Sequence, residues 1–220
     1  LSVLGTMLLW MGWLGFNGGS TLHLTEQVAR IVVHTVLAGV AGMMTALAIG
    51  WRKNDVPEVE LLLNGSLAGL VSITASCNTV STLGAIAIGA IGGGVMIALK
   101  ALLIRLRIDD AVDAVPVHLG GGIWGTVALA IFASPEELHT GLNFGSQLLV
   151  QLLGVLVCAV WAFGLSYLLL RTLDRVFPLR VSPEDEKMGL NVSEHKAKTE
   201  IYDLFKVMDA QAQTQNLSVR

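Results

Sequence analysis

Apolar residues run through this chain in long uncharged stretches, which cover residues 1–25, 31–51, 61–99, 114–135 and 138–170. A helix that crosses a bilayer needs about 20 mostly apolar residues. The stretch 61–99 is too long for one crossing, and its polar cluster Ser76-Cys77-Asn78-Thr79 is typical of a turn. The pattern therefore predicts six membrane-spanning helices, at residues 2–20, 28–51, 61–76, 81–104, 112–133 and 144–170.

Composition supports a membrane protein and also divides the chain. Hydrophobic residues make up 53% and charged residues 14%, against about 25% charged in soluble domains. Of the 31 charges, 16 fall in residues 171–220 and 15 in the first 170. We expect a transmembrane domain over 1–171 and a tail or linker over 172–220, with an amphipathic helix near 199–210. Disorder, nucleic-acid binding and a water-soluble α/β enzyme are disfavoured.

The basic residues predict how the spans are oriented, because Lys and Arg accumulate in cytoplasmic loops. The ends that follow the first, third and fifth predicted spans contribute only Arg30. The ends after the second, fourth and sixth spans hold the remaining basic residues near the spans: Arg52, Lys53, Lys100, Arg105, Arg107, Arg171, Arg175 and Arg180. This parity predicts a cytoplasmic tail and agrees with a count of six.

Glycines recur within the predicted spans at a spacing of four residues. The pairs are Gly65 and Gly69, Gly89 and Gly93, and Gly121 and Gly125. Small residues at this spacing let helix backbones approach closely inside a bilayer. We interpret them as packing positions.

Trp13, Phe16 and Ser20 share one face near the end of the first predicted helix, since they are three and seven residues apart. Two aromatic rings and a hydroxyl on one face suit a small cation. The aromatic faces attract the cation, and the hydroxyl oxygen can accept a hydrogen bond from it. The alternative is an aromatic belt at the membrane interface. Spacing alone leaves both open.

His118 is the only ionisable side chain between Asp113 and Glu136. An ionisable group within a span is costly in lipid and should face the protein interior or a pore. A desolvated imidazole is favoured in its neutral form, and can then orient a polar solute or relay a proton. The alternative is a histidine that hydrogen-bonds in a helix contact.

Other polar residues have simpler interpretations. Asp109, Asp110 and Asp113 are placed to cap the helix that follows them, and Pro116 is compatible with a helix start or a kink. The remaining histidines, His23, His34, His139 and His195, are treated as structural or solvated. No spacing indicates a metal site, a cofactor or a disulfide between Cys77 and Cys158.

The strings GWLGFNGGS (residues 12–20) and DDAVDAVPVH (109–118) together resemble the ammonium transporter family (Amt/Mep/Rh), in its Amt branch. Supporting strings are NGSLAGLVSITASC (64–77), HLGGGIWG (118–125), QLLVQ (147–151) and LRVSPEDEKMGLNVSEH (179–195). The resemblance implies an all-α polytopic membrane protein with two five-helix halves in inverted repeat and a final helix. This chain resembles the second half and that final helix, with the first half missing.

The resemblance also implies roles for individual residues. Phe16 resembles one ring of a stacked phenylalanine gate, and Trp13 and Ser20 resemble parts of the vestibule that recruits ammonium. His118 resembles the second of two pore histidines. Asp113 resembles the repeat counterpart of an acidic residue that supports recruitment, so a structural role is expected for it.

Two functions follow from the resemblance, and neither is enzymatic. The first is transport: NH4+ is recruited, deprotonated and conducted through a hydrophobic pore past the histidines. The second is an ammonium sensor that signals to a fused cytoplasmic module beyond the tail. The implied setting is the inner (plasma) membrane, as a homotrimer, with a PII-type signal protein or a fused signalling domain as partner and no nucleic acid.

Overall fold

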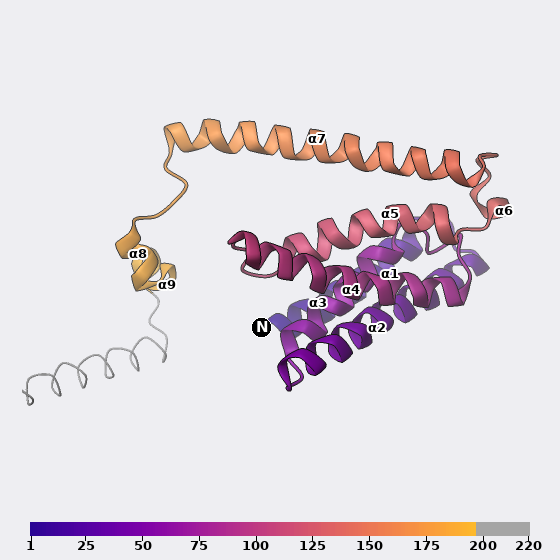
Figure 1. Cartoon of the computed structure of the whole chain (residues 1–220), viewed down its shortest axis with the longest axis horizontal. Coiled ribbons are helices and arrows are strands. Elements are labelled where there is room, and N and C mark those ends of the chain that lie inside the picture. The colour runs from indigo at the N-terminus through magenta and orange to yellow at the C-terminus, as the bar shows by residue number, and fades with distance from the viewer. Residues whose placement is uncertain (197–220) are drawn as a thin grey trace, which may run out of the picture. The chain divides into compact units, whose positions relative to one another are not determined.

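The structure, a computed structural model, describes residues 1–196, and these are almost entirely helical. Figure 1 shows the helices in chain order. Their bounds are α1 Ser2–Gly19, α2 Glu26–Asn54, α3 Val59–Ile73, α4 Thr82–Leu106, the π-helix η1 Val115–Gly120, α5 Gly121–Phe132, α6 Pro135–Leu138, α7 Phe144–Val176, α8 Pro183–Met188 and α9 Leu190–Ser193. The amphipathic helix expected near 199–210 lies outside the described residues.

Every predicted span corresponds to a helix, but the helices differ in length and apolar character. Four described segments are long and apolar enough to cross a membrane: Glu26–Lys53, Thr82–Leu106, Val115–Phe132 and Phe144–Val176. Helix α3 is apolar but has only 15 residues. Six crossings remain a prediction, whereas the helical class and the turn between α3 and α4 are confirmed.

The chain separates into two compact units, residues 1–160 and 161–220, with the boundary inside α7. The predicted boundary at residue 171, between the transmembrane domain and the tail, was placed where the density of charged residues rises, and it stays a prediction. In the described part of the second unit, the Ser182 hydroxyl accepts a hydrogen bond from the Asp185 amide and so begins α8. Arg180 pairs with Glu186 at 3.0 Å in the same segment.

Helices α2, α3 and α4 form the centre of the first unit, with α1 packed on α2 and α3, and with η1 and α5 packed on α3 and α4 (Figure 1). Glycine permits these contacts. A Cβ added at Gly69 or at Gly89 would collide with the carbonyl oxygen of Ala38 on α2, and one at Gly93 with that of Gly42. The predicted packing role of the small residues is confirmed, because backbone meets backbone at these positions.

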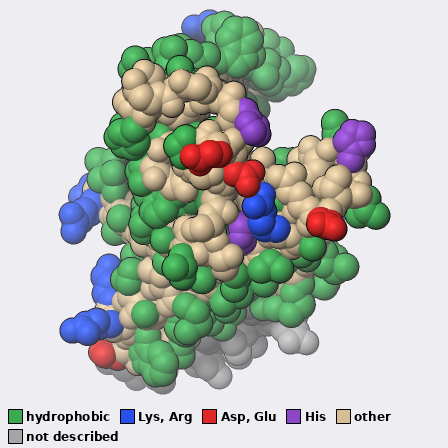
Figure 2. Space-filling model, turned by 90° about the vertical axis from the view of Figure 1, so that its right-hand side faces the viewer, with side chains coloured by type: hydrophobic (Ala, Val, Ile, Leu, Met, Phe, Trp, Pro, Cys, Tyr) green, Lys and Arg blue, Asp and Glu red, His purple; other side chains and the backbone are tan. Residues whose placement is uncertain are grey.

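Many large apolar side chains remain on the surface of this chain, among them Met7 and Met11 on α1 and Leu102 and Ile104 on α4. On the face drawn in Figure 2, hydrophobic side chains are widespread and charged ones are few. An apolar surface of this extent is typical of a protein that meets lipid or other membrane-embedded protein.

Candidate functional site

Three of the sequence-predicted site residues, Phe16, Ser20 and His118, line two hollows that lie beside α1, whereas Trp13 and Asp113 are not among the residues that line them. The phenylalanine hollow, of about 360 Å³, is lined among others by Phe16, Ser20, Thr74, Cys77 and Asn78. The histidine hollow, of about 600 Å³, is lined among others by Ser2, Thr6, Glu60, Asn64 and His118. Leu9 also lines the histidine hollow, and the seven residues from it to Phe16 correspond to about 10 Å of helix rise.

Phe16 and Trp13 form an edge-to-face pair on α1. Their ring centroids are 6.4 Å apart, with an angle of 69° between the planes. The Phe16 ring is exposed and lines the phenylalanine hollow. Trp13 is half-buried, and its indole N–H donates to the Thr74 hydroxyl over 2.8 Å. Trp13 is thus held in place while the Phe16 ring is presented to the hollow.

Ser20 lies on the same wall of the phenylalanine hollow. Its hydroxyl donates to the Phe16 carbonyl over 2.6 Å. A hydroxyl oxygen that donates its single proton keeps lone pairs for accepting. Ser20 can therefore accept a hydrogen bond from a donor in the hollow, which is the polarity a small N–H cation requires.

His118 lies in the π-helical segment η1, which continues without a break into α5. Short π-helical turns within α-helices are rare overall, but those that occur are often found at functional sites. The side chain is exposed to the histidine hollow, and within residues 1–196 neither ring nitrogen has a hydrogen-bond partner. The structure thus places an unengaged imidazole at the hollow, which favours the solute-facing interpretation over a helix contact.

Asp110 and Asp113, which precede this segment, have different roles. Asp110 caps as predicted, because its two carboxylate oxygens accept from the amides of Ala114 at 2.9 Å and Val115 at 2.7 Å. Asp113 does not cap. Its carboxylate is buried and accepts from Lys100 at 2.6 Å and from Asn64 at 2.8 Å. The cap expected of Asp113 is wrong because side chains from two other helices, Asn64 and Lys100, draw its carboxylate to themselves by donating to the same oxygen, Oδ2.

Several buried polar contacts near the two hollows have no counterpart in the sequence analysis. The Trp10 indole donates to the Ser66 hydroxyl at 3.1 Å, and the Asn17 amide donates to the Thr35 hydroxyl at 3.0 Å. The second contact ties α1 to α2 at the phenylalanine hollow, which Asn17 helps to line. The sequence offered one sign of such a contact: a side-chain amide, that of Asn17, is rare within an apolar stretch. This sign does not identify the partner of the amide.

The turn that walls the phenylalanine hollow is held by two side chains of α2, one helical turn apart. His34 is buried, and its Nδ1 lies 2.9 Å from the Cys77 carbonyl oxygen, while its Nε2 lies 3.3 Å from the Thr82 hydroxyl. Arg30 donates to the Asn78 carbonyl at 2.9 Å and pairs with Glu137 at 3.2 Å. His34 thus has the structural role assigned to it by default.

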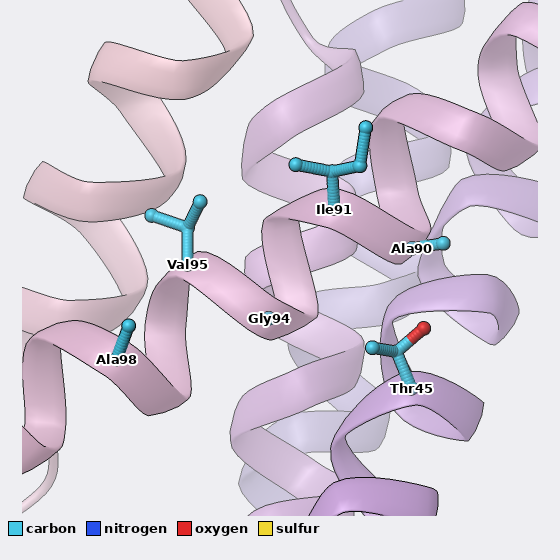
Figure 3. A pocket seen from close by; sticks show the side chains of 6 residues that line it. All are labelled: Thr45, Ala90, Ile91, Gly94, Val95 and Ala98. Carbon is cyan, nitrogen blue, oxygen red and sulfur yellow. The ribbon is translucent and has the colours of Figure 1, made fainter.

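A third hollow lies between α2 and α4 and differs in chemistry (Figure 3). Its lining consists of Thr45 and the α4 residues Ala90, Ile91, Gly94, Val95 and Ala98. The Thr45 hydroxyl is the single polar side-chain group among them, and none is titratable. This hollow offers nothing that moves a proton. Within the described residues, no group of three or more His, Cys, Asp or Glu side chains is arranged to hold a metal ion.

Comparison with known proteins identifies the family. The model of the Ammonium Transporter Family matches residues 1–200. A relative from Synechocystis sp. is 55% identical over 219 residues, which is 100% of this chain and 40% of the relative. Ammonium transporter Amt2 of Archaeoglobus fulgidus is 42% identical over 207 residues, which is 89% of this chain and 44% of that protein.

Solved structures agree with the sequence relatives. A protein described as a sensor Amt protein matches with a TM-score of 0.83 at 42% identity, over 87% of this chain and 48% of its own. Mep2 of Saccharomyces cerevisiae matches with a TM-score of 0.76 at 31% identity, over 83% and 43%. This chain thus spans less than half the length of these relatives. It is a multi-pass membrane protein that belongs to the ammonium transporter family, a family of transporters and not of enzymes.

Proposed function

We propose that the whole protein to which this chain belongs conducts ammonium across a membrane. The observation that carries the proposal is the alignment of Phe16 and His118 with two hollows on one side of α1. Along α1 the aromatic and hydroxyl site is separated from the hollow that holds the imidazole by residues 10–15, which are apolar or glycine. That order matches the recruitment, deprotonation and conduction steps.

Recruitment of NH4+ is assigned to the phenylalanine hollow. The Phe16 ring faces the hollow and attracts a cation through its π face, and the Ser20 oxygen accepts one of the four N–H groups. Trp13 does not line the hollow but packs edge-to-face on Phe16, with its own N–H already donated to Thr74. This donor therefore does not compete for the Ser20 oxygen.

Conduction between the hollows is assigned to an apolar stretch that admits neutral ammonia. Trp10 and Trp13 carry the two indole N–H groups on this part of α1. These groups already donate hydrogen bonds to the hydroxyls of Ser66 and Thr74. A bare cation loses its hydration in such a passage at a large free-energy cost. Ammonium avoids that cost by giving a proton to water before it enters, and charge crosses the membrane because that proton is carried over separately from the ammonia. K+ has no proton to lose and is excluded.

His118 is assigned to the next step of conduction. A neutral imidazole has one donor and one acceptor nitrogen, and both are unengaged within the described part of the chain. The ring can therefore orient ammonia through its acceptor nitrogen or pass a proton through the hollow. Asp113 supports this step from outside the pathway, because its carboxylate is occupied by Lys100 and Asn64.

The assembly and membrane location that we propose follow the family resemblance. They are a homotrimer in the inner (plasma) membrane with the tail on the cytoplasmic side, where a PII-type signal protein can bind. The alternative function, an ammonium sensor with a fused signalling module, has one supporting observation in the similarity to a sensor Amt protein. Transport remains our proposal, because the Archaeoglobus fulgidus relative that is 42% identical is named an ammonium transporter.

The test uses the full-length protein in liposomes and measures ammonium-driven current, methylammonium uptake and K+ leak. His118→Ala and His118→Asp are expected to reduce flux or to admit K+. Phe16→Ala is expected to change flux or selectivity more than stability. Unchanged uptake and unchanged K+ exclusion in the His118 variants would reject the pore assignment. A Phe16→Ala protein that assembles poorly, but whose surviving fraction transports normally, would reject the gate.

A further inference from the structure

An ion network lies where α3, α4 and the start of η1 meet. The Lys100 ammonium lies 2.6 Å from Asp113 Oδ2 and 2.7 Å from Glu60 Oε1. Asn64 donates to the same Asp113 oxygen at 2.8 Å. The Asp113 side chain is 8% exposed, that of Lys100 24% and that of Glu60 62%. The network therefore runs from a buried carboxylate to one in contact with solvent.

Burial of the ionised Asp113 carboxylate costs free energy unless the carboxylate is paired. Transfer of an ionised carboxylate out of water carries a large free-energy penalty, which only a close cation and hydrogen-bond donors offset. Asp113 has both, from two different helices. The pairing therefore defines where Asp113 must lie relative to α3 and α4.

The backbone of Asp113 links this pairing to the π-helix. Asp113 has φ 56°, in the left-handed region that is sparsely populated by residues other than glycine. Its carbonyl oxygen accepts from the Val117 amide at 3.1 Å, which is the first turn of the helical segment that contains His118. A carboxylate held by Lys100 and Asn64 thus anchors the residue from which that segment starts.

Residues of the network and His118 line the same hollow. Glu60 and Asn64 line the histidine hollow together with His118, and His118 follows Asp113 by five residues. A shift of Asp113 would move the start of η1 and turn the imidazole with it. Within residues 1–196, no hydrogen bond or ion pair of the imidazole opposes that movement.

We propose that Lys100 is a positioning residue for His118: through Asp113 it holds the π-helical segment in the register that presents the imidazole to the hollow. The inference deepens the proposed function and rests on it for its transport readout. Its structural readout does not, because the accessibility of the imidazole is measurable whether or not the protein conducts ammonium.

The experiment compares three variants of the full-length protein: K100R, K100M and the double variant K100M/D113N. K100R keeps the charge and is expected to retain flux. K100M leaves the Asp113 carboxylate without its cation, and its folded yield is expected to fall. The double variant removes both charges, so its folded yield and melting temperature are expected to recover toward those of the wild type.

The transport readout separates positioning from stability. In the folded double variant, methylammonium flux is expected to stay about tenfold or more below that of the wild type, because small misplacements of a reacting group carry large rate penalties. The pH dependence of the remaining flux is expected to shift as well. The control is Glu186→Gln, which removes the exposed Arg180–Glu186 pair, whose residues line neither hollow, and is expected to leave flux unchanged.

The second readout is the rate at which diethylpyrocarbonate modifies His118, followed by peptide mass spectrometry. It is expected to change at least twofold in the folded double variant and to match the wild type in K100R. A double variant with wild-type flux and modification rate would overturn the proposal, and so would one that fails to fold. An inactive wild type would reject the transport function alone and leave the modification test decisive for Lys100.

Discussion

Trp13 on α1 donates its indole N–H to the hydroxyl of Thr74, the residue that ends α3, over 2.8 Å. The Thr74 hydroxyl in turn donates to the Leu70 carbonyl at 2.7 Å. This chain of two hydrogen bonds crosses 61 residues of sequence. It ties the ring that packs on Phe16 to the end of the neighbouring helix.

Thr74→Val removes the acceptor of the Trp13 indole while it keeps the shape of the side chain. We expect a loss of about 1–3 kcal/mol in the free energy of unfolding, because a part-buried donor is left without its partner. Thr74→Ser keeps the hydroxyl and is expected to stay near the wild type. Thermal unfolding of both full-length variants in detergent measures the difference. Equal melting temperatures for the two would show that the hydrogen bond does not stabilise the fold.

Gly93 and Gly94 are adjacent residues with opposite surroundings and so form a matched pair. A Cβ at Gly93 would meet the backbone of Gly42, whereas a Cβ at Gly94 would meet nothing within 4 Å. Gly93→Ala is expected to destabilise the protein by about 1–3 kcal/mol through overpacking, and Gly94→Ala to leave stability unchanged. Folded yield by size-exclusion chromatography and melting temperature distinguish them. A larger effect at Gly94 would contradict the packing of α2 on α4.

His34 is expected to carry its proton on Nδ1, since the Cys77 carbonyl is purely an acceptor and lies 2.9 Å from that nitrogen. His34→Leu removes the donor and leaves the carbonyl unpaired, with an expected loss of about 1–3 kcal/mol. His34→Asn presents an amide N–H near the same position and is expected to lose less. The comparison is made by thermal unfolding. Equal losses would indicate that the packing of the ring, and not its hydrogen bond, holds the turn.

Burial raises the pKa of the Cys77 thiol above its ordinary value. The thiolate is the reactive form, so in the folded protein Cys77 is expected to react slowly with maleimide at pH 7. The native rate should rise only above the pH at which the unfolded thiol ionises. Over that range the folded state binds the thiol proton more tightly than the unfolded state, so this group's contribution to stability decreases as the pH rises.

The measurement uses a Cys158→Ala background, in which Cys77 is the only cysteine of residues 1–220. Labelling is followed by mass spectrometry in the folded protein and after unfolding in detergent. Equal labelling rates in the two states at pH 7 would contradict the burial of this side chain.

Much of the local structure could be predicted because it depends on neighbours in sequence. The turn at Ser76–Thr79 interrupts an apolar stretch with four residues of low helical preference, and the chain does reverse there before α4. Asp110 caps the segment after it because the free amides of a helix start lie within reach of its short side chain. The spacing of the glycines was sufficient to predict close packing, although it did not identify Ala38 and Gly42 as the opposing residues.

The site itself could be predicted only in part. The helical spacing of Trp13, Phe16 and Ser20 places them on one side of α1, and the lone His118 indicated an inward-facing imidazole. The π-helical form of its segment was not predicted, since Pro116 is equally compatible with an ordinary helix start. Asp113 was assigned to a cap because its neighbours allow one, and the partners that overrule this assignment are 13 and 49 residues away.

The sequence by itself determined which segments are helical, where they are apolar enough for a bilayer, and which family the chain resembles, because hydropathy, periodicity and short motifs are properties of neighbouring residues. Only the tertiary structure decided that Lys100 and Asn64 hold Asp113, and that Thr74 holds Trp13. A buried polar group takes whichever donor or acceptor the packing of helices brings within about 3 Å. That choice depends on how the helices are rotated and how deeply they pack against one another, which no local pattern encodes.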